Sequence, residues 1–216
     1  MPGELQTQPE APRKRSRVVL WVGLAVGTGA LLAIFVGVSW TRASAKRSAC
    51  WHNLRSVCIA MHLYADENDG DFPISRDLLY PQYTDNLRTL LCPADPRGYY
   101  DRPRPEPLEQ LEQWSSHVYL PGQACDLPGS FIVMYDKPGN HWGGGINVAH
   151  IDASVEWWPS SRQAEFLRRV QLQTEAVAKW RASGKPAKAF GEFVSPELQD
   201  LMGRPDPELQ HGKAMW

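Results

Sequence analysis

Oxygen-bearing side chains gather around a glycine about a third of the way along the chain, and their chemistry is that of a calcium site. The run consists of Asp66, Glu67, Asn68, Asp69 and Asp71, which flank Gly70. Hard oxygen ligands suit Ca²⁺, and Asp66, Asp69 and Asp71 are the candidate ligands. The spacing does not match an EF-hand loop, and a solvated helix end is the more common explanation of such a run. Calcium is the one cofactor that the sequence suggests.

A second group of metal-ligand residue types lies farther along, and consists of His141, His150, Asp152 and Glu156. Imidazoles and carboxylates are acceptable ligands for Zn²⁺. On a hairpin, however, His150 and Asp152 share the half-buried face of Ile146 and Val148, because side chains alternate along a strand. A structural role for the histidine is therefore the favoured interpretation.

Motifs that would indicate catalysis are not found in the sequence. It has no Gly-rich phosphate loop, no Ser elbow and no HExxH segment. The formal net charge of −1 at pH 7 provides no basic field for nucleic acid. We therefore expect a non-enzymatic protein without a nucleic-acid partner.

The four cysteines leave the question of disulfides open. Cys50 and Cys58 fall on one expected helix about 12 Å apart, too far to bridge each other. Cys92 with Cys125 is the easiest pair to imagine if the chain lies in an oxidising compartment. Three complete pairings are possible, and the alternative is that some of the thiols are small buried apolar groups.

The strongest signal in the chain is the segment 18–40, a run of 23 residues without a charged side chain. As a helix it spans about 34 Å, enough to cross a hydrocarbon core of about 30 Å. Its length is greater than that of a signal-peptide core, and a buried globular helix is rarely apolar all round. The segment predicts a transmembrane helix in a lipid bilayer. Small residues recur on it every four positions, a pattern that favours helix self-association, at Ala25, Gly29, Ala33 and Gly37.

The basic residues around this segment indicate its orientation. Four precede it, namely Arg13, Lys14, Arg15 and Arg17, and the residues that follow are slightly less basic. Positive charge marks the cytoplasmic flank. We therefore expect a cytoplasmic tail at 1–17, the membrane helix at 18–40 and a remainder outside the cytoplasm.

The periodicity of the remainder predicts an α+β fold. The first helix continues to about Glu67 with one apolar stripe, and Asn68-Asp69-Gly70 ends it. Short apolar runs predict strands near 117–120, 131–135, 146–151 and 154–158. A further helix is expected over about 161–182. The expected domains are thus an α+β domain at 41–160, in which the long helix packs on a small antiparallel sheet, and a C-terminal helix and irregular tail at 161–216.

Four segments resemble a known family. Cys50-Trp51-His52-Asn53-Leu54-Arg55, Tyr64 to Pro73, Cys92-Pro93-Ala94-Asp95 and His141 to Asp152 occur in the order seen in prepilin-like proteins of the type II secretion family. The last segment is similar to the signature of the prepilin processing-associated H-X9-DG group. The signature residues here are His141, Gly143, Gly144, Asn147 and Asp152. The resemblance implies a pilin-like fold and a structural or binding role in a secretion or pilus-like assembly. It also implies an anchor in the inner membrane and an α+β domain in the periplasm.

The sequence departs from this family in its processing signal. Ten residues instead of nine separate His141 from Asp152, and Ala153 replaces the glycine of the signature. Arg17 precedes Val18 where a prepilin has glycine, and no glutamate follows within the apolar segment. A stand-alone, membrane-tethered ligand-binding or receptor module on a pilin-like fold is therefore the alternative.

Overall fold

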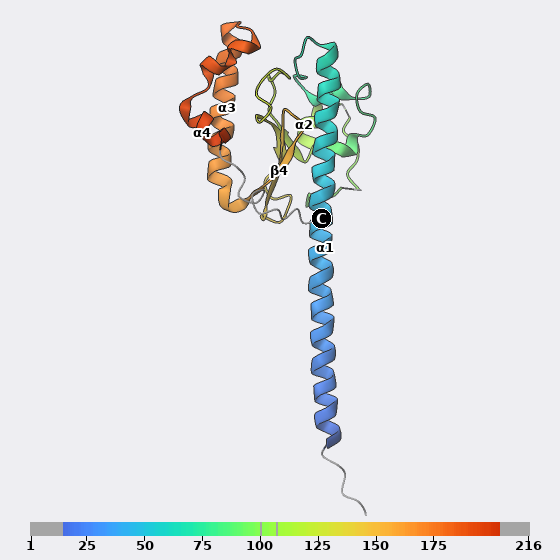
Figure 1. Cartoon of the computed structure of the whole chain (residues 1–216). Helices are drawn as coiled ribbons and strands as arrows, with labels where there is room; N and C mark the ends of the chain where they lie inside the picture. The colour runs from blue at the N-terminus through green and yellow to red at the C-terminus, as the bar shows by residue number, and fades with distance from the viewer. Residues whose placement is uncertain (1–14, 100, 107, 204–216) are drawn as a thin grey trace, which may run out of the picture. The chain divides into compact units, whose positions relative to one another are not determined.

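The computed structural model describes residues 15–99, 101–106 and 108–203 (Figure 1). Most of the predicted tail 1–17, with Arg13 and Lys14, lies outside the described residues, as does the end of the predicted C-terminal tail. The chain divides into two compact units, Met1–Arg42 and Ala43–Trp216. The helix predicted at 161–182 therefore belongs to the same unit as the sheet.

The described part of the first unit is helical and belongs to α1 (Arg15–Glu67). Its large apolar side chains between Val18 and Trp40 are 42% to 71% exposed. Thr28 and Ser39 donate their hydroxyls to the carbonyls of Leu24 and Phe35, each at 2.8 Å, so their polar groups are satisfied within the helix. Among the described residues, α1 is the one helix long and apolar enough to cross a membrane.

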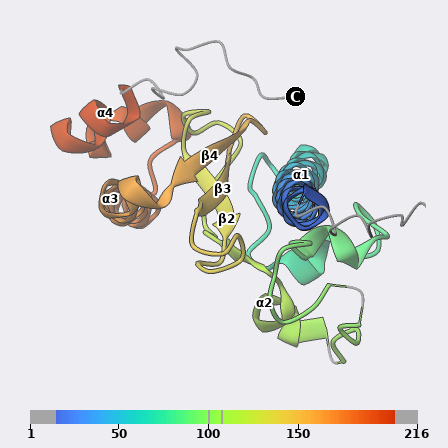
Figure 2. The same cartoon turned by 90° about the horizontal axis from the view of Figure 1, so that it is seen from below.

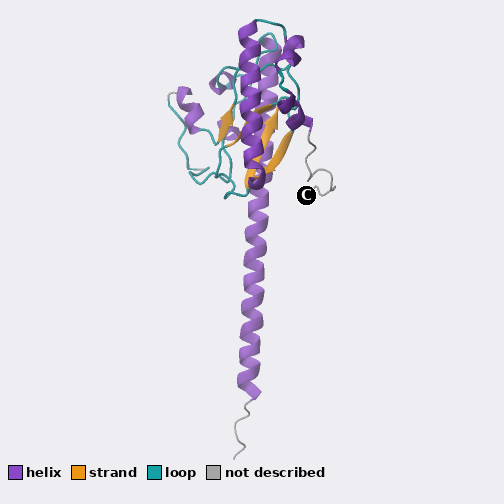
Figure 3. Cartoon of the chain, turned by 90° about the vertical axis from the view of Figure 1, so that its left-hand side faces the viewer, coloured by secondary structure: helices purple, strands orange, loops and turns teal. Residues whose placement is uncertain are grey.

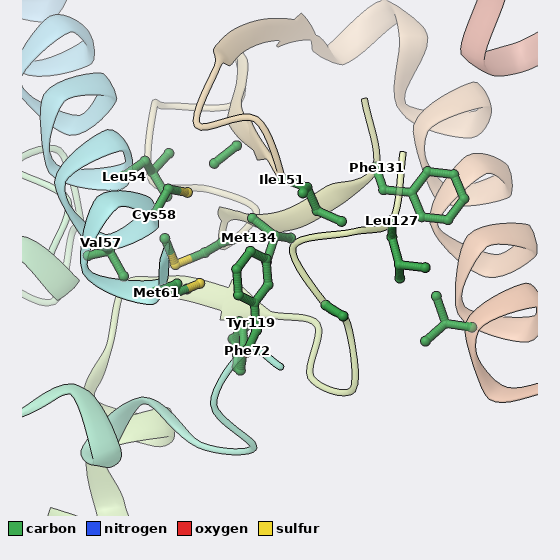
Figure 4. Close-up of a cluster of buried hydrophobic side chains, with 14 of the residues drawn as sticks. Leu54, Val57, Cys58, Met61, Phe72, Tyr119, Leu127, Phe131, Met134 and Ile151 are labelled. Carbon is green, nitrogen blue, oxygen red and sulfur yellow. The ribbon is translucent and has the colours of Figure 1, made fainter. Parts of the chain in front are cut away.

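The second unit begins within α1, whose later turns carry the predicted apolar stripe. Leu54, Val57, Cys58 and Met61 are buried, as the spacing predicted, and Figure 4 shows them in one cluster with residues of the loops and sheet. The helix ends at Glu67, and the N–H of Gly70 then donates to the carbonyl of Ala65 at 2.9 Å. Gly70 has φ +82°, a conformation that glycine adopts without strain.

The four strands form one antiparallel sheet in the order β1-β2-β3-β4. They are β1 (His117–Tyr119), β2 (Ile132–Asp136), β3 (Gly145–His150) and β4 (Val155–Pro159). The register sets His117 opposite Asp136 and Val148 opposite Glu156. Ala153 takes φ +60° in the turn between β3 and β4, so this turn forms with alanine where the resembling family has glycine.

Further helices, all short except α3, precede and follow the sheet, and Figure 3 shows how much of the second unit is loop. Before the sheet lie η1 (Arg76–Leu79), η2 (Leu87–Leu90), η3 (Leu108–Gln110) and α2 (Leu111–Trp114). After it lie η4 (Ser160–Arg162), α3 (Gln163–Ser183), η5 (Ala187–Phe193) and α4 (Pro196–Gly203).

The sheet lies between α1 and α3 (Figure 2), so its central strands are covered on both faces. The main core joins α1 to Val133 and Ala149. A second cluster unites Ile132, Val148 and Trp158 with Phe166 of α3. The half-buried face predicted for the hairpin is therefore wrong for β3, where α3 supplies a second covering layer. The α+β class, with a long N-terminal helix, a small antiparallel sheet and a C-terminal helix, is confirmed.

Candidate functional site

Side chains from three distant parts of the second unit converge on one buried point. They are Cys50 of α1, Cys92 after η2, Asp136 at the end of β2 and His141 in the loop between β2 and β3. One ligand atom from each lies within 4.8 Å of the others. In the described part of the chain this is the one group of three or more such residues arranged to hold a metal ion. We call these four residues the donor cluster.

Local structure explains how each residue reaches this point. Cys50 precedes Leu54 by one helical turn, so it shares the buried face of α1. Cys92 begins a tight turn in which its carbonyl accepts the N–H of Asp95 at 3.0 Å. Asp136 ends β2 next to His117 of β1. His141 follows a turn in which Asn140 donates to the carbonyl of Lys137 at 3.2 Å.

The carboxylate of Asp136 is the centre of the donor cluster. Its Oδ1 accepts from the thiol of Cys50 at 2.9 Å and lies 3.3 Å from Nε2 of His117. Its Oδ2 lies 2.9 Å from Nε2 of His141 and accepts from the backbone N–H of Asn147 at 2.9 Å and from its Nδ2 at 3.0 Å. Burial alone would raise the pKa of Asp136, but the hydrogen bonds from His117 and His141 hold it below its usual range. This buried carboxylate is therefore ionised.

The two thiols differ in their protonation. Burial raises the pKa of Cys50, so it remains a thiol that donates to Asp136. Interaction with the neighbouring Cys50 lowers the pKa of Cys92 to about 6 against the opposing effect of burial, and the hydrogen bond with His141 assists. Burial lowers the pKa of His141, yet its hydrogen bonds with Asp136 and Cys92 raise the pKa to about 9. The two shifts have opposite directions and favour a thiolate at Cys92 beside a protonated His141.

A Cys-His-Asp nucleophilic triad does not fit this geometry. In a triad the thiol and the carboxylate hold opposite nitrogens of the ring, because the carboxylate orients the base toward the nucleophile. Here Sγ of Cys92 at 3.3 Å and Oδ2 of Asp136 at 2.9 Å both approach Nε2 of His141. Both Cys50 and Cys92 are 0% exposed. Donor atoms that converge on one enclosed point are instead the arrangement found around a bound ion.

Two of the predicted signature residues lie at the donor cluster. His141 belongs to it, and Asn147 donates to Asp136. Gly143 and Gly144 lie in the loop between β2 and β3, directly before Gly145. Asp152 is exposed in the turn between β3 and β4, where its Oδ1 accepts the N–H of Ser154 at 2.9 Å.

The group of His141, His150, Asp152 and Glu156 does not form as a unit. Nε2 of His150 lies 2.9 Å from Oε1 of Glu156, and its Nδ1 lies 2.8 Å from the carbonyl of Ser130. His150 is thus satisfied within the fold, as expected of a structural histidine. His141 contacts Asp136 and Cys92 instead.

The acidic residues considered for calcium lie elsewhere on the molecule. Asp66 and Asp69 are exposed, and Oδ1 of Asp71 forms an ion pair with Arg181 at 2.7 Å. Their carboxylates do not converge among the described residues in the way that the donor cluster does.

The expectation that Cys92 and Cys125 form the easiest pair is wrong. All four cysteines are free, and Cys92 lies beside Cys50, whereas the thiol of Cys125 contacts Asp126. Sequence reasoning also missed Cys50, Cys92 and Asp136 as members of one site with His141. The available signal was that Cys50, Cys92 and His141 each occur in a segment that resembles prepilin-like proteins; Asp136 lies outside these segments.

Comparisons with protein-family models, curated proteins and solved structures find no match to this chain. The resemblance to prepilin-like proteins therefore stays a prediction.

Proposed function

We propose that this chain is a single-pass membrane protein whose pseudopilin-like α+β domain has a structural or binding role, as a component of a type II secretion or pilus-like assembly. The observation that carries the proposal is the contrast along α1. Residues 18–40 are exposed and carry no charged side chain, while Leu54 to Ala65 supply part of the core of the second unit.

The exposed segment supports a bilayer as its partner. Burying a large apolar side chain contributes about 1.5–3 kcal/mol, so a run of exposed Val, Leu, Ile and Phe is unfavourable in water. Lipid offers no hydrogen-bond partners to backbone N–H and C=O groups, and in a helix these groups pair with one another. The stripe of Ala25, Gly29, Ala33 and Gly37 is exposed as well, and it is the surface we propose for self-association in the membrane.

The proposed location is the inner membrane, with a cytoplasmic N-terminus and a periplasmic second unit. The basic residues before Val18 support this orientation. A periplasm-specific enzyme reporter fused after Trp216 tests it. We expect reporter activity together with resistance of the chain to alkaline extraction. Activity from a cytoplasm-specific reporter alone would overturn the orientation, and release by alkali would overturn the anchor.

A tethered ligand-binding module is the second candidate, and a cavity favours it. The cavity holds about 110 Å³ and is mostly apolar, with Tyr135, Ile146, Trp158 and Phe166 among its lining residues. The residues around Arg17 and Val18 also lack the prepilin processing pattern.

Intact-mass analysis of the membrane form separates the two candidates. A chain cut next to Val18 favours the secretion component, because prepilin peptidase would have acted. An uncut chain that forms no cross-linked assembly favours the tethered module.

A further inference from the structure

We propose that Cys50, Cys92, Asp136 and His141 bind one zinc ion, which joins α1 to the sheet and its loops. The proposal concerns a site inside the second unit and holds for either of the two functions above. It rests on the donor set, the spacing of the atoms and the groups that support them.

The donor set is one that zinc accepts. Zn²⁺ is borderline-soft and binds thiolates, imidazole and carboxylate, and four such ligands complete a tetrahedral shell. Binding would release the protons of the Cys50 thiol and of His141 to solvent, because both must be deprotonated to act as ligands. Calcium and magnesium require oxygen ligands throughout, so the sulfur atoms of Cys50 and Cys92 exclude them. No position is left open for water or substrate, which is typical of a structural site.

The spacing is close to that of a tetrahedral zinc shell. With Zn–S of about 2.3 Å and Zn–N or Zn–O of about 2.0–2.1 Å, neighbouring ligand atoms lie about 3.4–3.8 Å apart. Sγ of Cys92 is 3.3 Å from Nε2 of His141, and that nitrogen is 2.9 Å from Oδ2 of Asp136. Small side-chain movements that break the hydrogen bond from Cys50 to Asp136, now 2.9 Å, would open the shell around the ion.

Neighbouring groups already support Cys92 and Asp136 as anions, and another packs against His141. The backbone N–H of Ala94 donates to Sγ of Cys92 at 3.3 Å, which favours a thiolate. Asn147 donates twice to Asp136 and fixes its orientation. Trp157 packs edge-on against His141, with ring centroids 5.4 Å apart. Partners of this kind hold metal ligands in place, and their loss weakens metal binding about 10–100-fold.

The full chain, purified in detergent under reducing conditions and analysed for metals, tests the proposal. We expect close to one zinc ion per chain, loss of the ion to a strong chelator, and uptake of one Zn²⁺ on back-titration against a chromophoric chelator. Replacement by Co²⁺ should give thiolate-to-cobalt charge-transfer absorption and the visible bands of a tetrahedral site.

Matched variants locate the ion. Cys92→Ser should abolish the charge-transfer absorption or greatly reduce it, whereas Cys125→Ser, at a thiol outside the donor cluster, should leave it unchanged. Asn147→Ala should weaken Zn²⁺ binding about 10–100-fold with the same stoichiometry.

The wild-type chain alone is decisive if Cys92→Ser does not fold. A folded wild-type chain that neither contains nor takes up zinc would overturn the proposal, because the donor cluster would then be a hydrogen-bonded core. A Cys50–Cys92 disulfide found by mass spectrometry in the chain as isolated from its membrane would also overturn it. So would full Co²⁺ absorption in a folded Cys92→Ser variant.

Discussion

The guanidinium of Arg76 is completely buried and donates from Nε to Oε1 of Glu112 at 2.9 Å, with a second ion-paired contact between Nη2 and Oε2. Its Nη1 also donates to the hydroxyl of Ser115 at 3.0 Å, and Nη2 donates to the carbonyl of His117 at 3.2 Å. This arginine connects η1 to α2 and to the first strand. Glu112 is the carboxylate that compensates its charge.

Glu112→Ala should therefore destabilise the second unit strongly, because it leaves Arg76 buried without its counter-ion. Loss of one partner of a buried pair costs about 3–5 kcal/mol. We expect about 2–3 kcal/mol here, since the side chain of Glu112 is 40% exposed and water replaces part of the interaction. Denaturant unfolding followed by tryptophan fluorescence measures the change.

Glu197→Ala is the control for this prediction, because its partner Arg168 is also exposed. That change should cost less than about 1 kcal/mol. If the two substitutions lower the free energy of unfolding by equal amounts, the burial of Arg76 does not make its ion pair more important for stability than the exposed pair.

The buried face of α1 should contribute much more to stability than its exposed faces. Leu54 and Met61 are 0% exposed, and truncation of either to alanine should cost about 2–5 kcal/mol. Arg55→Ala and Asp66→Ala, at exposed positions, should each cost well under about 1 kcal/mol. Denaturant melts of the four single variants decide. If all four substitutions lower the free energy of unfolding by the same amount, α1 is not part of the core.

Acid should destabilise the second unit in part through Asp95. Burial tends to raise its pKa, but hydrogen bonds from Arg97, Ser116 and Arg102 outweigh it and hold the pKa below the usual range. Because the folded pKa is depressed, the stabilisation is present above the unfolded pKa of about 3.9 and is lost as the pH falls below it.

Asp95→Asn should therefore lower stability at neutral pH and flatten its decline below about pH 4. Urea midpoints measured from neutral pH into this acid range test the slope. Asp85→Asn, at an exposed carboxyl, is the matched control. A slope in Asp95→Asn identical to that of the wild type would contradict the assignment.

Gly145 begins β3 at a position where a side chain does not fit. Its φ is +149°, and an added Cβ would lie 2.3 Å from the carbonyl oxygen of Trp158. Gly145→Ala should thus cost more than about 2 kcal/mol. Gly144→Ala, whose Cβ would meet no atom closer than 3.5 Å, should change stability by about 0.5 kcal/mol or less. Thermal melts of the two variants provide the comparison.

The sequence alone determined the long first helix, the four strands and the helix α3, because each depends on local spacing. An uncharged run defined the apolar part of α1, and a 3.6-residue stripe identified Leu54, Val57 and Met61 as its buried face. Asn68-Asp69-Gly70 marked the end of the helix, since glycine adopts positive φ without strain. Short apolar runs between turn residues located the four strands.

Only the tertiary structure decided which side chains meet. Cys50 and Asp136 are 86 residues apart and Cys92 and His141 are 49 apart, so no periodicity or motif length relates them. Their convergence depends on the packing of α1 against the sheet and on the register that places Asp136 beside His117. For the same reason the sequence did not predict that β3 is buried on both faces, because the second cover comes from α3, a separate element packed from the other side.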